Sequence, residues 1–197
     1  PIPLLASRFP LACVCVCVWG QFGTPETPYT YLHDDGERDS QLNITAPVDT
    51  AWMMTFTVVE GWEWIGAVEL VWGNTVPGQP ANVVIWSDPD QDGVPIDAEV
   101  LSIAPTTTAN VLTSIYNRVE VPPVYIGPPG TKFFVGAQIN DIYNTAPAAI
   151  DIDQPGPGCY IAYTRTPPLN LNDMAGVGGS GAAMLDYTGI LKVMVRG

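Results

Sequence analysis

A short acidic segment has the residue types and spacing of a calcium-binding loop. It reads Asp88-Pro89-Asp90-Gln91-Asp92-Gly93, and five residues separate Gly93 from Glu99, which fits the pattern D-x-D-x-D-G-x5-E. A hard cation such as calcium takes about six to eight oxygen ligands, and glycine permits the sharp turn that gathers them. We therefore predict a structural calcium site. Its ligands would be side-chain oxygens of Asp88, Asp90, Asp92 and Glu99 and the backbone carbonyl of Val94.

The surroundings of this loop differ from those of a helix-loop-helix calcium site. The preceding residues 81–87 read as a strand, and Pro95 removes a backbone N–H that pairing between two such loops would use. Only one such loop is present. The segment is therefore expected to connect two strands, and the alternative is an acidic Asp/Gly/Pro turn that holds no metal.

The sequence offers little catalytic chemistry. His33 is the only histidine, and no G-x-S-x-G nucleophile motif accompanies it. We expect His33 to lie in a surface turn and the protein not to be an enzyme. Trp62 and Trp64 flank Glu63 and are weak candidates for stacking on a sugar, with core packing as the alternative.

The elements that would position these residues are strands. Only 14% of the 197 residues are charged, against roughly 25% in average domains, while 47% are hydrophobic and the chain contains 19 Gly and 20 Pro. Such a composition, with turn signals between short apolar runs, predicts an all-β fold. We expect an antiparallel β-sandwich with jelly-roll or Greek-key character over residues 31–197. Its strands are predicted at 41–45, 51–59, 64–72, 81–87, 98–104, 113–121, 132–139, 158–164 and 188–195.

The net charge of −13 limits the partners. It repels nucleic-acid phosphates and anionic membrane surfaces. The sequence has no run of 18 or more apolar residues, so no membrane span is expected.

The N-terminal residues form a separate unit. Residues 1–20 contain an apolar strand pattern, and residues 21–30 read as a Pro/Gly linker. Residues 11–19 are apolar on both alternating faces, so a strand there must be covered on both sides. We predict that it is donated to the sheet of a neighbouring copy, which would build a filament; the alternative is a central strand of its own domain. The subunit-interface residues would be Leu11, Cys13, Val14, Cys15, Val16, Cys17, Val18 and Trp19.

The four cysteines are disulfide candidates. Cys13, Cys15 and Cys17 lie on one face of the predicted strand, so they cannot readily bridge one another. One of them could reach Cys159 if their strands are neighbours. The others would then bond between subunits or pack as small hydrophobic residues.

Five segments of the chain form a recognisable pattern: Asp34-Asp35-Gly36, Trp52, Val71-Trp72-Gly73, the segment from Ile85 to Ala98, and Phe133-Phe134-Val135-Gly136. With these residues the chain resembles, from about residue 30 to residue 197, a recurrent β-sandwich module of bacterial secreted and cell-surface proteins. The acidic loop is the most specific part of this resemblance, which implies an extracellular β-sandwich without established catalytic activity and does not cover residues 1–29.

Two functions follow as expectations. The first is a non-enzymatic, pilus-like structural subunit, outside the cell or on its surface, that polymerises with copies of itself by strand donation. The alternative is a monomeric calcium-dependent module that binds carbohydrates, such as surface glycans, or another surface.

Overall fold

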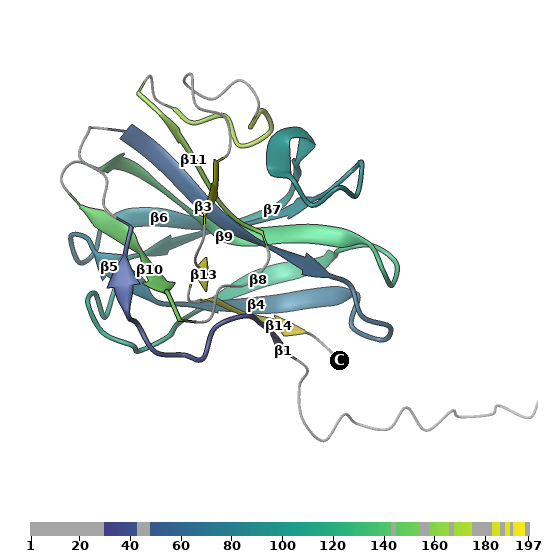
Figure 1. Ribbon diagram of the computed structural model, residues 1–197, viewed down its shortest axis with the longest axis horizontal. Helices are drawn as coiled ribbons and strands as arrows, with labels where there is room; N and C mark the ends of the chain where they lie inside the picture. Colours follow the sequence, from purple (N-terminus) through teal and green to yellow (C-terminus); the bar gives the residue numbers. More distant parts are fainter. Residues whose placement is uncertain are drawn as a thin grey trace, which may run out of the picture.

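The computed structural model describes residues 30–42, 48–142, 145–153, 158–165, 168–174, 183–185, 188–189 and 191–195. All paired strands in this part of the chain are antiparallel, and they form three sheets that pack together (Figure 1). A four-stranded sheet has the order β1 (Thr30–Leu32), β14 (Leu191–Val195), β4 (Trp64–Leu70) and β8 (Asn117–Tyr125).

The largest sheet has six strands. Its order is β12 (Ala183–Leu185), β11 (Cys159–Thr164), β3 (Val48–Thr57), β9 (Lys132–Ile142), β6 (Pro80–Ser87) and β7 (Glu99–Thr107). A small third sheet contains β13 (Thr188–Gly189), β10 (Ala146–Asp151) and β2 (Ser40–Gln41), and β5 (Trp72–Asn74) also pairs with β10. A single turn of 3-10 helix, η1 (Pro95–Asp97), lies between β6 and β7.

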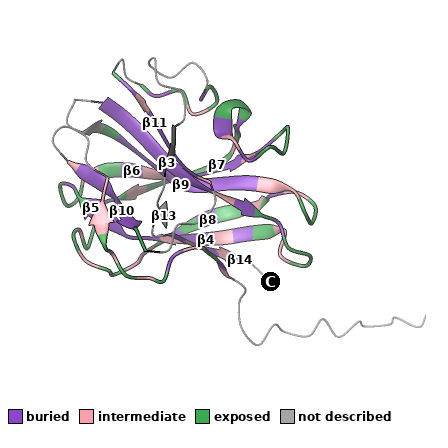
Figure 2. Cartoon of the chain, in the orientation of Figure 1, coloured by how far each residue is buried: buried purple, intermediate pink, exposed green. Residues whose placement is uncertain are grey.

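The central strands of the six-stranded sheet are covered on both faces, as the buried colouring of β3 and β9 in Figure 2 shows. Trp52, Met54 and Phe56 of β3 pack in the main core with the four-stranded sheet, while Ala51 and Met53 belong to a second core on the opposite face. The second core is closed by Leu169 and Met174. Alternation along a strand thus sends apolar side chains into two separate cores.

Gly136 shows how closely the central strands approach. It pairs with Met53, and a Cβ atom built on it would lie 1.8 Å from the carbonyl oxygen of Trp52. No side chain fits at that distance, so glycine is required for the pairing of β3 with β9.

The prediction of an all-β antiparallel sandwich is confirmed, while its jelly-roll or Greek-key connectivity stays a prediction. Several boundaries differ. The expected strand 64–72 divides into β4 and β5, and the strand expected from residue 113 begins at Asn117. β10 was not predicted, and it contains Pro147, a residue type that is rare in strand interiors.

The predicted donor strand, residues 1–20, and residues 21–29 of the predicted linker lie outside the described residues, so strand donation and the role of Cys13, Cys15 and Cys17 stay predictions. The last residue of the predicted linker, Thr30, begins β1. None of the described residues forms a helix that is long and apolar enough to cross a membrane.

Candidate functional site

The acidic loop connects β6 to β7 at one end of the sandwich. Lys132, the first residue of β9, pairs with Thr57 at the end of β3, and Phe133 pairs with Ser87 at the end of β6. The ends of β3 and β6 and the start of β9 therefore meet at one edge, beside the loop (Figure 1). The expectation that the loop joins two strands is confirmed.

The loop is folded by its own carboxylates. The N–H of Gly93 donates to Asp88 Oδ2 at 2.8 Å, the N–H of Asp92 to Asp90 Oδ1 at 3.1 Å, and the N–H of Val94 to Asp92 Oδ1 at 2.6 Å. Gly93 has a φ of 85°, which glycine adopts without the strain that a Cβ would cause. These bonds turn the three carboxylates toward a common centre.

The carboxylates of Asp88, Asp90 and Asp92 offer ligand oxygens that all lie within 4.8 Å of one another. Asp88 is 1% exposed, and its Oδ1 is buried without a hydrogen-bond partner. Burial raises the pKa of Asp88, the hydrogen bond from Gly93 lowers it, and the charges of Asp97, Asp90 and Asp92 raise it. A buried, unpaired carboxylate oxygen beside two like charges is unfavourable unless a cation joins it.

The other predicted ligands are placed differently. Glu99 is exposed at the start of β7 and does not join the close carboxylate group, and Val94 contributes its N–H to the loop. Their roles as ligands stay predictions. The structure adds Asp97, whose Oδ2 accepts the N–H of Asp90 at 3.1 Å. The sequence could have indicated Asp97, because the segment from Ile85 to Ala98, which resembles the secreted module, ends with the pattern P-x-D-A that contains this residue.

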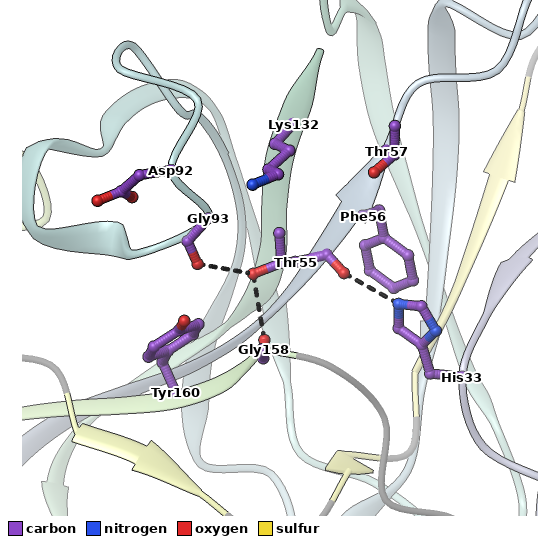
Figure 3. A pocket seen from close by; sticks show the side chains of 9 residues that line it. All are labelled: His33, Thr55, Phe56, Thr57, Asp92, Gly93, Lys132, Gly158 and Tyr160. Atoms are coloured by element: carbon purple, nitrogen blue, oxygen red, sulfur yellow. Dashed lines mark hydrogen bonds between the residues drawn. The ribbon is translucent and has the colours of Figure 1, made fainter. Parts of the chain in front are cut away.

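A cavity of about 270 Å³ adjoins the acidic loop (Figure 3). His33 forms part of its wall: its Nε2 donates to the carbonyl oxygen of Thr55 at 2.9 Å, and its ring stacks on Phe56 with centroids 4.6 Å apart. Sequence reasoning placed His33 in a turn and missed the cavity. The cavity is lined by His33, Thr55, Phe56, Thr57, Asp92, Gly93, Lys132, Gly158 and Tyr160.

A second acidic cluster was not predicted. Carboxylate oxygens of Asp35, Asp151 and Asp153 also lie within 4.8 Å of one another, and the N–H of Asp35 donates to Asp151 Oδ2 at 3.2 Å. Asp39 is adjacent and accepts the N–H of Ile152 at 3.0 Å. Either triad could hold a metal ion, and oxygen ligands of this kind suit calcium.

The structure separates the two tryptophans that were candidates for sugar stacking. Trp62 packs partly buried against the main core. Trp64 is 48% exposed and pairs with Tyr125, which is 47% exposed, with ring centroids 5.4 Å apart. Sequence reasoning missed Tyr125, because strand register brings it opposite Trp64.

Cys159 lies buried in the main core and forms no disulfide with another residue that the structure describes. Burial raises its pKa to about 11, so the thiol is unreactive at neutral pH. Its predicted disulfide partners lie outside the described residues, and that pairing stays a prediction.

No protein-family model and no curated protein matches the chain. The resemblance to the secreted β-sandwich module therefore stays a prediction, and function must be argued from the acidic loop and its neighbours.

Proposed function

We propose that this protein is a non-enzymatic extracellular module that binds calcium in its acidic loop and a carbohydrate or another surface beside it. One observation carries the proposal: Oδ1 of Asp88 is buried without a hydrogen-bond partner, and the carboxylates of Asp90 and Asp92 converge on the same place. A divalent cation would satisfy that oxygen and neutralise the repulsion within the loop.

Calcium fits the loop better than magnesium or a transition metal. The close group consists of carboxylates, which are hard oxygen ligands, and contains neither histidine nor cysteine. An irregular loop suits the flexible coordination of calcium, whereas magnesium demands near-ideal octahedral geometry. Water or a bound partner would supply the ligands that the side chains do not.

The binding role rests on what surrounds the loop. The cavity shares Asp92 and Gly93 with it. Trp64 is the first residue of β4 and pairs with Tyr125, the last residue of β8. Next to this pair, the N–H of Ile126 donates to the carbonyl oxygen of Glu63. The chain's only histidine donates its Nε2 proton to the Thr55 carbonyl, which fixes the position of its ring in the wall of the cavity.

Calorimetry with calcium chloride on the chelator-treated full chain tests the proposal. We expect one calcium per chain, with binding lost in Asp88→Asn and kept in Asp35→Asn, a matched change in the other acidic cluster. Absence of calcium binding by the wild type, or undiminished binding by Asp88→Asn, would overturn the calcium site.

The surface-binding part has its own test. Binding of the full chain to an array of glycans is measured once with calcium and once with chelator. The binding signals should depend on calcium and should be weaker for Trp64→Ala or for Lys132→Gln than for the wild type. Signals that are absent, or indifferent to both substitutions and to calcium, would contradict a binding role.

Strand donation is the second candidate function, and the edge strand β7 favours it. Among the described residues β7 pairs only with β6, which leaves its other edge without a strand partner, although β8 lies near β7. Leu101 is 39% exposed and Ile103 is 45% exposed on one face of this strand. An open strand edge with apolar side chains is a template for pairing with another chain.

Removal of residues 1–20 tests strand donation. The truncated protein should remain folded, fail to form filaments and accept a synthetic peptide of residues 11–19. Filaments that persist after truncation, or a folded truncated protein that ignores the peptide, would exclude the donor role.

A further inference from the structure

We propose that the cavity beside the acidic loop binds the carboxylate of an acidic sugar, a uronic acid, and that this binding is coupled to calcium. The inference rests on the proposed calcium-dependent binding function and names its ligand class. Four features of the cavity carry it: its size, an unpaired cation, free hydroxyl groups, and an aspartate that it shares with the calcium loop.

The size of the cavity suits one sugar ring. Its volume of about 270 Å³ lies near the lower end of small-molecule pockets, which span roughly 300–1,000 Å³. One wall contains the half-buried ring of His33, which stacks on the buried ring of Phe56, so His33 supplies the aromatic surface for the apolar face of a pyranose.

Lys132 supplies the positive charge. Its Nζ lies 3.2 Å from the point where a Cβ on Gly93 would be, so the ammonium is held over the loop. It forms no ion pair or hydrogen bond with any residue that the structure describes. The whole chain has 7 basic residues against 20 acidic ones. An unpaired ammonium that lines a cavity in so acidic a chain points to an anionic ligand group.

Hydroxyl groups around the lysine suit a sugar. Tyr160 and Thr57 line the cavity (Figure 3), and neither hydroxyl has a hydrogen-bond partner in the described part of the chain. The phenolic hydroxyl of Tyr160 can donate a hydrogen bond at neutral pH. Because Nε2 of His33 already donates to Thr55, its Nδ1 is free to meet a sugar hydroxyl.

Asp92 connects the cavity with the calcium loop. It lines the cavity and belongs to the carboxylate triad. Without calcium its negative charge opposes a carboxylate beside Lys132, whereas bound calcium cancels that charge. Calcium and uronate should therefore strengthen each other's binding by the same factor, because coupling between two sites is reciprocal.

Binding of galacturonic acid to the full chain, measured by calorimetry with calcium and with chelator, tests the inference. Galactose, which lacks the carboxylate, and acetate, which lacks the ring, are the matched ligands. With calcium we expect galacturonic acid to bind at least about tenfold more tightly than either, and about tenfold more tightly than with chelator, within the usual range of coupling between sites. Equal binding of galactose and galacturonic acid would overturn the ligand class, and equal binding with and without calcium would overturn the coupling.

Lysine variants separate this inference from the proposed function. Lys132→Gln should weaken galacturonic acid binding about tenfold or more and leave calcium affinity in the absence of sugar no weaker. Lys132→Arg should retain most of the sugar binding. Lys192→Gln is the control, because Lys192 lies 3.7 Å above the ring of Tyr116, outside the cavity lining. Calcium binding with no effect of Lys132→Gln on galacturonic acid would refute this inference alone, whereas absence of calcium binding would refute the proposed function.

Discussion

The molecule contains two clusters of three aspartates that differ in the hydrogen-bond partners of their carboxylate oxygens. In the loop, Asp88, Asp90 and Asp92 come from five consecutive residues, and one buried oxygen of Asp88 has no partner. In the other cluster, Asp35 and Asp151 are 116 residues apart in sequence, and the backbone N–H of Asp35 donates to the carboxylate of Asp151. Both clusters therefore share a high density of negative charge, and the unsatisfied buried oxygen of Asp88 sets the loop apart.

The second cluster and its neighbour Asp34 connect segments that are distant in sequence. Asp34 Oδ1 accepts the hydroxyl of Tyr116 at 2.6 Å and the N–H of Gly36 at 2.9 Å, and its Oδ2 accepts the N–H of Leu191 at 3.0 Å. One buried carboxylate thus joins the turn after β1 to β14 and to the segment before β8. Here the partners of the carboxylates are the protein's own donors.

The largest expected effect is that of calcium on stability. At a free calcium concentration one hundred times Kd, binding to the folded state alone adds about 2.7 kcal/mol to the free energy of unfolding. Asp88→Asn should abolish this gain. Without calcium the same variant should lose little stability or gain some, because it removes one charge from a repelling group.

Urea unfolding of both proteins, with calcium and with chelator, checks this prediction. Asp35→Asn is the control and should keep the full calcium response. If Asp88→Asn and Asp35→Asn lost the stabilisation by calcium equally, or if calcium did not stabilise the wild type, the contrast between the two clusters would be refuted.

The next effect in size is that of Tyr116→Phe. It removes a hydrogen bond to a buried, ionised carboxylate, which costs about 1.5–3 kcal/mol. Calcium should not alter the cost, because Tyr116 belongs to the other region. Urea unfolding at neutral pH measures it, and a cost that calcium abolishes would show that the two regions act as one.

The pH dependence of this variant follows from Asp34. Burial raises the pKa of Asp34, and the hydrogen bond from Tyr116 counteracts that rise. Because folded Asp34 holds its proton more tightly than unfolded Asp34, its contribution to stability falls as pH rises from 3.8 through the raised pKa. Tyr116→Phe should raise this pKa further, so its cost should be smallest in acid and grow as Asp34 ionises. A cost independent of pH would contradict the assignment.

The two regions also show what sequence can predict. The acidic loop is local, so the spacing of its residues was enough to predict that the carboxylates of Asp88, Asp90 and Asp92 converge, whereas Glu99, which was also predicted, does not join them. The second cluster, the pairing of Trp64 with Tyr125, and the contact of His33 with Thr55 depend on strand register, which alternation alone does not specify. The sequence predicted that residues 11–19 form a strand covered on both faces. Within the described residues, β3 is such a strand, because Met53 and Met54 enter different cores.

A smaller effect is expected from Asp39→Ala. Asp39 is exposed and accepts the N–H of Ile152 at 3.0 Å. Removal of this acceptor should cost about 0.5 kcal/mol, the lower end for a hydrogen bond, because water can replace it. Hydrogen exchange should accelerate at the Ile152 amide and stay unchanged in the acidic loop; unchanged exchange at Ile152 would contradict the assigned bond.

The smallest effect, and the sharpest test of the contrast, is expected from Asp153→Asn. A hydrogen bond to Asp151 and the charge of Asp39 raise the pKa of Asp153, as expected for carboxylates that repel one another without a cation. Loss of one charge in Asp153→Asn should therefore leave the melting temperature unchanged or slightly higher. The wild type and Asp153→Asn should each bind one calcium ion per chain. The cluster of Asp35, Asp151 and Asp153 has no unpartnered buried carboxylate oxygen among the described residues. If the wild type bound two calcium ions per chain and Asp153→Asn bound one, a high density of negative charge alone would therefore be enough to form a calcium site.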